Sequence, residues 1–142
     1  MQPNGKKVLL VEDDDNLASV YLTRLEHEGF NVRRVSDGEH ALATAVDFLP
    51  DLVLLDMMMP NISGFDVLDI LRNTPETADA KVVILSARAQ DTDRDKAAKL
   101  GANDYLVKSQ VVISDVIAII KNQLQEPAEN SSDKPDTKTT QP

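Results

Sequence analysis

Five short apolar segments, rich in β-branched residues or leucine, recur along the chain, and this repeat is the feature that most restricts its fold. They lie roughly twenty to thirty residues apart, at residues 8–11, 32–35, 52–55, 82–85 and 105–107. Segments of this length and composition are typical of buried strands. The segment 52–55 shows no polar alternation, which is typical of a central strand covered on both faces.

Between these segments, apolar residues recur with the spacing of a helix face. Gly29, Pro50 and Gly101 stand where they can end helices before the next strand. The sequence therefore predicts helices at residues 17–25, 38–49, 65–71, 92–100 and 111–124. Strands that alternate with helices favour right-handed crossovers, a parallel sheet and helices on both of its faces. We therefore expect an α/β, doubly wound fold.

The charge balance and the missing residue types limit what the protein can bind. With 24 acidic against 15 basic residues, its formal net charge of −9 opposes binding to nucleic-acid phosphates. The chain has no cysteine, so disulfides and thiolate metal sites are excluded. No apolar run approaches the roughly 18 residues that span a bilayer. We expect a cytoplasmic protein that contacts neither nucleic acid nor membrane directly.

The composition changes after residue 125. From Glu126 to Pro142, proline, serine, threonine, asparagine and lysine are frequent, and Ala128 is the only apolar residue. Such a segment cannot bury enough apolar surface to offset the entropy of ordering. We expect one folded domain over residues 1–125 and a disordered polar tail over residues 126–142, which could be a linker stub, a solubilising end or a partner tether.

Polar or charged residues directly follow four of the expected strands. Glu12 and Asp13 follow the first strand, Asp56 the third, Ser86 the fourth and Lys108 the fifth. Because ligands in such sheets bind beyond the carboxyl ends of the strands, these side chains are expected to converge on one site. Acidic residues before a helix can also act as N-caps, and that alternative stands for the acidic run after the first strand.

Clustered carboxylates favour a bound cation. Two of them about 4 Å apart repel by roughly 4 kcal/mol at an effective dielectric constant of about 20. Oxygen ligands without cysteine favour Mg²⁺, Mn²⁺ or Ca²⁺ over zinc, and His27 and His40 lie away from the ends of the expected strands. Lys108 and Ser86 would add donors for phosphoryl oxygens. The sequence therefore predicts a site for a divalent cation and a phosphoryl group.

Four stretches, in this order and spacing, resemble the receiver domains of two-component response regulators. They are Val8-Leu-Leu-Val-Glu-Asp-Asp, Asp51-Leu-Val-Leu-Leu-Asp-Met-Met-Met-Pro with Gly64, Val83-Ile-Leu-Ser-Ala, and Gly101-Ala-Asn-Asp-Tyr-Leu-Val-Lys. The resemblance covers residues 6 to about 125. It implies a flavodoxin-like (βα)5 fold with strand order 2-1-3-4-5, and a stand-alone, single-domain receiver in phosphorelay signal transduction.

The resemblance also implies roles for individual residues. Asp56 would accept a phosphoryl group from the phosphohistidine of a sensor histidine kinase or phosphotransfer protein. The implied ligands of Mg²⁺ are Asp13, Asp56, the backbone carbonyl of Met58 and, largely through water, Glu12. The implied contacts of the phosphoryl oxygens are Lys108, the Ser86 hydroxyl and the Ala87 backbone N–H. Met58 and Arg88 occupy the positions that tune the loss of phosphate.

A conformational switch is part of the same resemblance. Movement of Ser86 toward the phosphoryl group would be coupled to Tyr105 turning inward. The face formed by helix 4, strand 5 and helix 5 would then control a downstream effector protein. Tyr105 could instead be a static, half-buried residue.

The last predicted helix is more apolar than one core-facing stripe requires. Val112 and Ile119 fall about 100–120° away from the stripe formed by Ile113, Ile117 and Ile120. They could pack on a neighbouring helix or form an interface with an effector or a second copy. Our hypothesis is that phosphorylation drives a homodimer through helix 4, strand 5 and helix 5.

Other functions are weighed against specific residues. The family usually has proline after the lysine that corresponds to Lys108, whereas this chain has Ser109. A serine there favours a trans peptide bond. A phosphorylation-independent, receiver-like scaffold is therefore kept as an alternative function. An aspartyl-phosphate hydrolase would need a second acid where this chain has Met58. A flavodoxin-like electron carrier would place its flavin phosphate against the acidic run that begins at Glu12. We expect a regulatory phosphoacceptor that catalyses only its own phosphorylation and dephosphorylation, and no enzyme acting on an external substrate.

Overall fold

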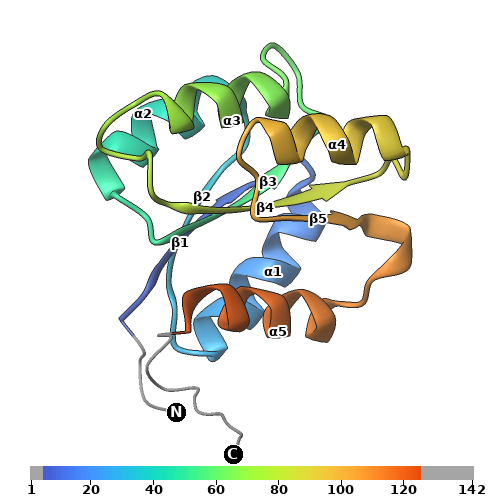
Figure 1. Ribbon diagram of the computed structural model, residues 1–142. Helices are drawn as coiled ribbons and strands as arrows, with labels where there is room; N and C mark the ends of the chain where they lie inside the picture. The colour runs from blue at the N-terminus through green and yellow to red at the C-terminus, as the bar shows by residue number, and fades with distance from the viewer. Residues whose placement is uncertain (1–4, 126–142) are drawn as a thin grey trace, which may run out of the picture.

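The computed structural model describes residues 5–125, which form a five-stranded parallel sheet between two layers of helices (Figure 1). The strands are β1 Lys7–Val11, β2 Asn31–Val35, β3 Leu52–Asp56, β4 Lys81–Ser86 and β5 Asp104–Val107. The helices are α1 Asp15–His27, α2 Gly38–Phe48, α3 Gly64–Arg72, α4 Asp91–Lys99 and α5 Ile113–Leu124. The strand order β2-β1-β3-β4-β5 confirms the predicted topology. The predicted tail at residues 126–142 lies outside the described part of the chain.

The centre of the sheet is strand β3, all of whose residues are buried. It pairs with β1 on one side and with β4 on the other. The unbroken apolar run 52–55 belongs there because helices cover both faces of a central parallel strand. Strand β2 pairs only with β1 and is half-exposed, which accounts for its two arginines.

Two apolar cores lie on opposite faces of the sheet. Successive side chains of a strand point to opposite faces, so Leu9 and Val53 pack under α2, α3 and α4, whereas Leu10 and Leu54 pack under α1 and α5 (Figure 1). Full burial of one leucine side chain stabilises the fold by about 1.5–3 kcal/mol. This packing holds the carboxyl ends of the strands rigidly at one edge of the sheet.

Three helices begin with the side-chain caps that their sequences favour. Asp14 accepts a hydrogen bond from the Leu17 N–H at 3.0 Å, and Asp37 and Ser63 cap α2 and α3 in the same way. An acidic or hydroxyl oxygen at this position satisfies an N–H group that the helix leaves unpaired. The capping alternative for the acidic run therefore applies to Asp14.

The clearest difference from the predicted elements lies before α5. The helix was expected from residue 111, but a 3₁₀ turn at Lys108–Gln110 intervenes and α5 begins at Ile113, with Val112 as its N-cap. Val112 is therefore not part of the helix face on which the sequence placed it. Within residues 5–125, no helix is both long enough and apolar enough to span a membrane.

Candidate functional site

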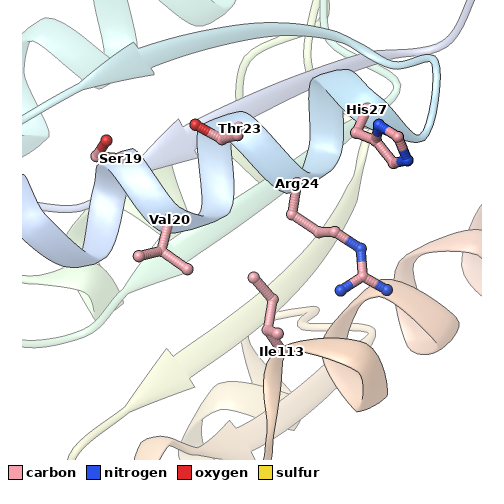
Figure 2. Close-up of a pocket in the computed structure, with 6 residues that line it drawn as sticks. All are labelled: Ser19, Val20, Thr23, Arg24, His27 and Ile113. Carbon is pink, nitrogen blue, oxygen red and sulfur yellow. The ribbon is translucent and has the colours of Figure 1, made fainter.

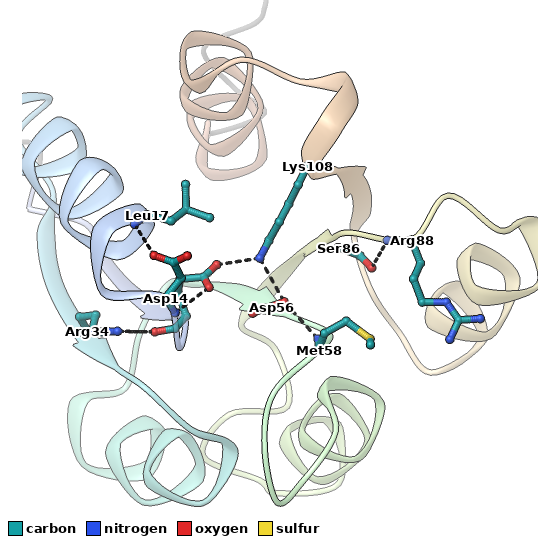
Figure 3. A network of polar contacts seen from close by, with 9 residues as sticks. Asp14, Leu17, Arg34, Asp56, Met58, Ser86, Arg88 and Lys108 are labelled. Atoms are coloured by element: carbon teal, nitrogen blue, oxygen red, sulfur yellow. Dashed lines mark hydrogen bonds and ion pairs between the residues drawn. The ribbon is translucent and has the colours of Figure 1, made fainter.

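The ends of four adjacent strands bring the predicted site residues together (Figure 3). Glu12 directly follows β1, Asp56 ends β3, Ser86 ends β4 and Lys108 follows β5. Glu12, Asp56 and Ser86 are each at most 2% exposed, which is rare for such polar side chains. Burial of this kind requires partners that compensate for the loss of water.

Three carboxylates form an acidic cluster at this edge. Glu12, Asp13 and Asp56 each offer an oxygen, and these oxygens lie within 4.8 Å of one another. Glu12 and Asp56 are buried, whereas Asp13 is exposed. A set of hard oxygen donors, open to solvent at one side, fits a divalent cation such as Mg²⁺, which keeps part of its water shell. This acidic cluster could therefore hold a metal ion.

Lys108 faces the acidic cluster from the end of β5. Its Nζ lies 3.1 Å from Glu12 Oε1 and 3.5 Å from Asp56 Oδ1. Burial lowers the pKa of Lys108, but the charge of Asp56 and the contact with Glu12 outweigh this effect and hold the pKa above its usual value. The ammonium group is therefore charged at neutral pH and lies where it can bind an oxyanion next to Asp56. The Lys108–Ser109 peptide bond is trans.

The carboxyl group of Asp56 is unusually basic for an aspartate. The pKa of Asp56 is raised from 3.8 to about 7. Burial is the main cause, and the charge of Glu12 adds to the rise. The backbone N–H of Met58, 3.1 Å from Oδ1, and the charge of Lys108 oppose it. At neutral pH without a cation, this carboxyl group is therefore partly protonated. A bound cation would favour its ionised, nucleophilic form.

The stability of the metal-free protein is expected to depend on pH through Asp56. Its pKa is higher in the folded state than in the unfolded chain, so its contribution is greatest below pH 3.8 and is lost as the pH rises toward about 7. Relative to Asp56→Asn, the native protein should lose about 2–3 kcal/mol of unfolding free energy between about pH 5 and pH 8. Urea denaturation of both proteins with a chelator measures this difference, and a difference independent of pH would contradict the assignment.

In the loop after β4, the backbone of Arg88 contacts both Ser86, at the end of β4, and Tyr105, on β5. The Ser86 hydroxyl oxygen accepts a hydrogen bond from the Arg88 N–H at 3.0 Å, and the Tyr105 hydroxyl donates to the Arg88 carbonyl at 3.0 Å. The Arg88 side chain points away from Asp56 and lies 3.0 Å from Asp93 on α4 (Figure 3). The sequence placed Ser86 and Tyr105 in one switch, but it could not show that the backbone of Arg88 joins them.

A cavity of about 200 Å³ lies beside this link. Its lining includes Met57, Ser86, Arg88 and Tyr105, and the ring of Tyr105 is already buried, with 7% exposure. Ala87, by contrast, is exposed in the loop between Ser86 and Arg88. Tyr105 already lies inward without a phosphoryl group, so its predicted inward turn on phosphorylation and its predicted coupling to Ser86 both remain hypotheses.

The loop after Asp56 turns tightly around Met57. The Gly64 N–H donates to the Met57 carbonyl at 3.1 Å, and Met58 projects outward with 53% exposure. A Cβ atom added at Gly64 would lie 2.7 Å from Met57 Cα and 2.8 Å from the Asp56 carbonyl oxygen. Glycine is therefore required at this position because two backbone atoms approach it closely.

Gly64→Ala is expected to destabilise the protein by about 1–3 kcal/mol, because the backbone beside Asp56 must shift to accommodate the methyl group. Helix propensity alone predicts the opposite sign, since alanine is the better helix former by up to about 1 kcal/mol. Urea denaturation of Gly64→Ala and of Asp69→Ala, an exposed position on the same helix, tests this. A stabilised Gly64→Ala variant would show that the contact is not restrictive.

The predicted interface residues differ in their surroundings. Val112 is 62% exposed at the start of α5, whereas Ile119 is partly buried and packs against the core under α1 and α5. A groove of about 520 Å³ lies nearby, between α1 and the start of α5 (Figure 2). It is lined by Ser19, Val20, Thr23, Arg24, His27 and Ile113. With no carboxylate in its lining, this groove does not fit a cation.

Comparison with known proteins gives a family match over most of the chain. Residues 8–121 match the family described as response regulator receiver domain. The transcriptional regulatory protein CpxR of Escherichia coli strain K12 is 48% identical over 102 residues, which cover 72% of this chain and 42% of CpxR. The phosphate regulon transcriptional regulatory protein PhoB of Rhizobium meliloti strain 1021 is 37% identical over 102 residues, covering 72% of this chain and 45% of PhoB. The chain thus spans less than half the length of these curated relatives.

Solved structures share the same fold. One is the receiver domain of sensor histidine kinase PA1611 from Pseudomonas aeruginosa PAO1, which has a magnesium ion coordinated in its active site cleft. It is 28% identical to this chain with a TM-score of 0.76, and the match covers 84% of this chain and 97% of that domain. The BeF3-activated N-terminal receiver domain of Klebsiella pneumoniae RstA is 26% identical with a TM-score of 0.78, covering 85% of this chain and 100% of that domain. The region matched by the family contains the whole acidic cluster together with Ser86 and Lys108.

Proposed function

The chain belongs to the response regulator receiver domain family, and from this premise we propose that Asp56 accepts a phosphoryl group from the phosphohistidine of a sensor histidine kinase or phosphotransfer protein. The observation that carries the proposal is a buried carboxylate beside two further acids, with a lysine Nζ 3.5 Å away. A solvated surface aspartate would not have this environment. Burial, a facing cation and neighbouring metal ligands suit a nucleophile that must receive a charged group.

The chemistry follows from the positions of these groups. A carboxylate oxygen of Asp56 attacks phosphorus while the bond from phosphorus to the donor nitrogen breaks, and the product is an acyl phosphate. Lys108, the Ser86 hydroxyl and the Ala87 N–H bind the phosphoryl oxygens. Holding these donors in place before the reaction lowers its barrier through positioning and charge neutralisation.

Mg²⁺ is the cofactor that this site fits best. The proposed ligands are Asp13, Asp56, the backbone carbonyl of Met58 and, through water, Glu12, in agreement with the oxygen donors of the acidic cluster. When bound, Mg²⁺ neutralises charge on the phosphoryl oxygens and favours the ionised form of Asp56. Glu12 also contacts Lys108, so the carboxylate and the ammonium group position each other.

Phosphorylation is proposed to act on α4, β5 and α5 through the loop after Ser86. The Ser86 hydroxyl can donate to a phosphoryl oxygen while its oxygen still accepts from the Arg88 N–H, so a shift of Ser86 toward the phosphoryl group would also pull on Arg88. Arg88 in turn contacts Tyr105 on β5 and Asp93 on α4. The local charge change thereby biases a two-state surface. A downstream effector protein would read that surface, and Val112 and Ile119 are proposed to contribute to an effector or homodimer interface. Met58 and Arg88 flank the site and would tune the loss of phosphate.

Intact-mass analysis tests the proposed function. The full chain is incubated with acetyl phosphate, with Mg²⁺ or with a chelator, and the expected result is a gain of one phosphoryl group that requires Mg²⁺. Peptide mapping should then locate the group on the peptide that contains Asp56. No gain under any condition would contradict the proposal and favour the alternative of a receiver-like scaffold that partners recognise without phosphate.

A further inference from the structure

Arg34, on the edge strand β2, holds the loop that carries the acidic cluster. Its Nε and Nη2 atoms both donate to the backbone carbonyl oxygen of Glu12, at 3.0 and 2.7 Å (Figure 3). Nη2 also lies 3.0 Å from Oδ1 of Asp15, the first residue of α1. One guanidinium group therefore joins the residue after β1 to the start of the next helix.

The backbone of Glu12 is held from β2 at both of its polar groups. Its N–H donates to the Val35 carbonyl at 3.1 Å, and its carbonyl accepts from Arg34. That carbonyl belongs to the peptide unit that joins Glu12 to Asp13. Its orientation therefore sets the directions in which two of the three cluster carboxylates leave the chain.

The neighbouring Arg33 has different surroundings. Its Nη1 lies 3.2 Å from Asp47 on α2, and its guanidinium stacks on the Phe48 ring at 4.4 Å. Because alternate strand residues face opposite sides, Arg34 lies on the α1 side of the sheet and Arg33 on the α2 side. The side chains of Arg34 and Arg33 are 24% and 51% exposed. The two arginines therefore offer a matched pair with equal charge but different contacts.

We propose that Arg34 is a positioning residue for the cation site, which raises the affinity for Mg²⁺ by fixing the peptide between Glu12 and Asp13. The inference rests on the proposed function in so far as the acidic cluster takes Mg²⁺.

Arg34 can change the affinity for Mg²⁺ in two ways, and these have opposite signs. Its positive charge alone disfavours a nearby cation, so removing it would tighten binding, whereas loss of the two-point contact with the carbonyl would loosen binding. Groups that orient metal ligands typically change metal affinity by about 10–100-fold, so positioning is the larger effect.

Titration calorimetry with MgCl₂ on the full chain tests this inference. Arg34→Met is expected to bind Mg²⁺ about tenfold more weakly than the native protein. Arg34→Lys keeps the charge but has no planar fork, so we expect an intermediate loss of about threefold. Arg33→Met, the control, should stay within about twofold of native affinity because Arg33 contacts neither the loop nor the acidic cluster.

The outcomes separate this inference from the proposed function. Native or tighter Mg²⁺ binding by Arg34→Met, or equal weakening by Arg33→Met, would overturn the positioning role. If thermal unfolding shows that Arg34→Met is not folded, Arg34→Lys decides, and native affinity in that variant would overturn the inference. A native protein that binds Mg²⁺ but is not phosphorylated would contradict the proposed function, while the comparison of affinities would still decide the role of Arg34. A native protein that binds no Mg²⁺ would overturn both.

Discussion

Replacing Asp56 with asparagine is expected to reduce Mg²⁺-dependent phosphorylation by more than about a thousandfold, to the limit of detection by intact mass. The amide is isosteric with the carboxyl group but cannot form an acyl phosphate. Glu12 and Asp13 should not replace it, because Glu12 pairs with Lys108 and Asp13 lies exposed at the rim. The measurement is the mass gain of the full chain over time with acetyl phosphate and saturating Mg²⁺.

The matched control is Asp51→Asn. Asp51 immediately precedes β3 and accepts a hydrogen bond from the Lys7 N–H at 2.8 Å, at the opposite end of the strand from Asp56. This variant should be phosphorylated at the native rate. Asp56→Asn should stay folded, because an uncharged side chain at a buried position removes a desolvation cost. Residual phosphorylation of Asp56→Asn at more than a tenth of the native rate would mean that another residue is the acceptor.

Lys108→Met is expected to have the second largest effect, a fall of about 100-fold in the initial rate of phosphorylation. Methionine keeps the apolar stem but removes a positive charge that lies close to both Asp56 and Glu12. Removing one donor that stabilises developing negative charge typically slows catalysis by about 10²–10³-fold. The charge of Lys108 also lowers the pKa of Asp56, so less of the nucleophilic carboxylate would be present at neutral pH.

The rate of Lys108→Met is measured at saturating Mg²⁺ and donor, with Lys99→Met as the control. Lys99 ends α4 at the surface, away from the strand ends, and its loss should leave the rate unchanged. The Mg²⁺ affinity of Lys108→Met should stay the same or rise, since a positive charge next to the acidic cluster has been removed. A rate within threefold of native would show that Lys108 does not bind the transferred group.

Several features of this protein could be predicted from the sequence because they depend on local patterns. The unbroken run 52–55 predicts a central strand, and that strand is β3, buried at every position. The polar residues after each strand lie at one edge because parallel strands with helical crossovers must end on the same side. Met58 and Tyr105 could be predicted as site residues only through the family motifs, since neither the type nor the spacing of these residues indicates a role in the site.

Other features depend on which segments meet in space, and the sequence alone could not predict them. Val112 lies outside α5 because the chain first forms a 3₁₀ turn after Lys108, and boundaries of this kind depend on the packing of the loop. Ile119, predicted to lie off the core-facing stripe, is partly buried because the α1 side of the sheet supplies a core there.

The sequence by itself determined the succession of strands and helices along the chain and the chemistry at the strand ends, because each of these follows from residue types at short spacing. The tertiary structure alone decided the partners of that chemistry. Arg34 reaches the carbonyl of Glu12, and the Tyr105 hydroxyl reaches the carbonyl of Arg88. These contacts join residues 22 and 17 positions apart, and their acceptors are backbone carbonyls, which every residue possesses. Only the register of adjacent strands and the course of the loops bring each donor to its acceptor.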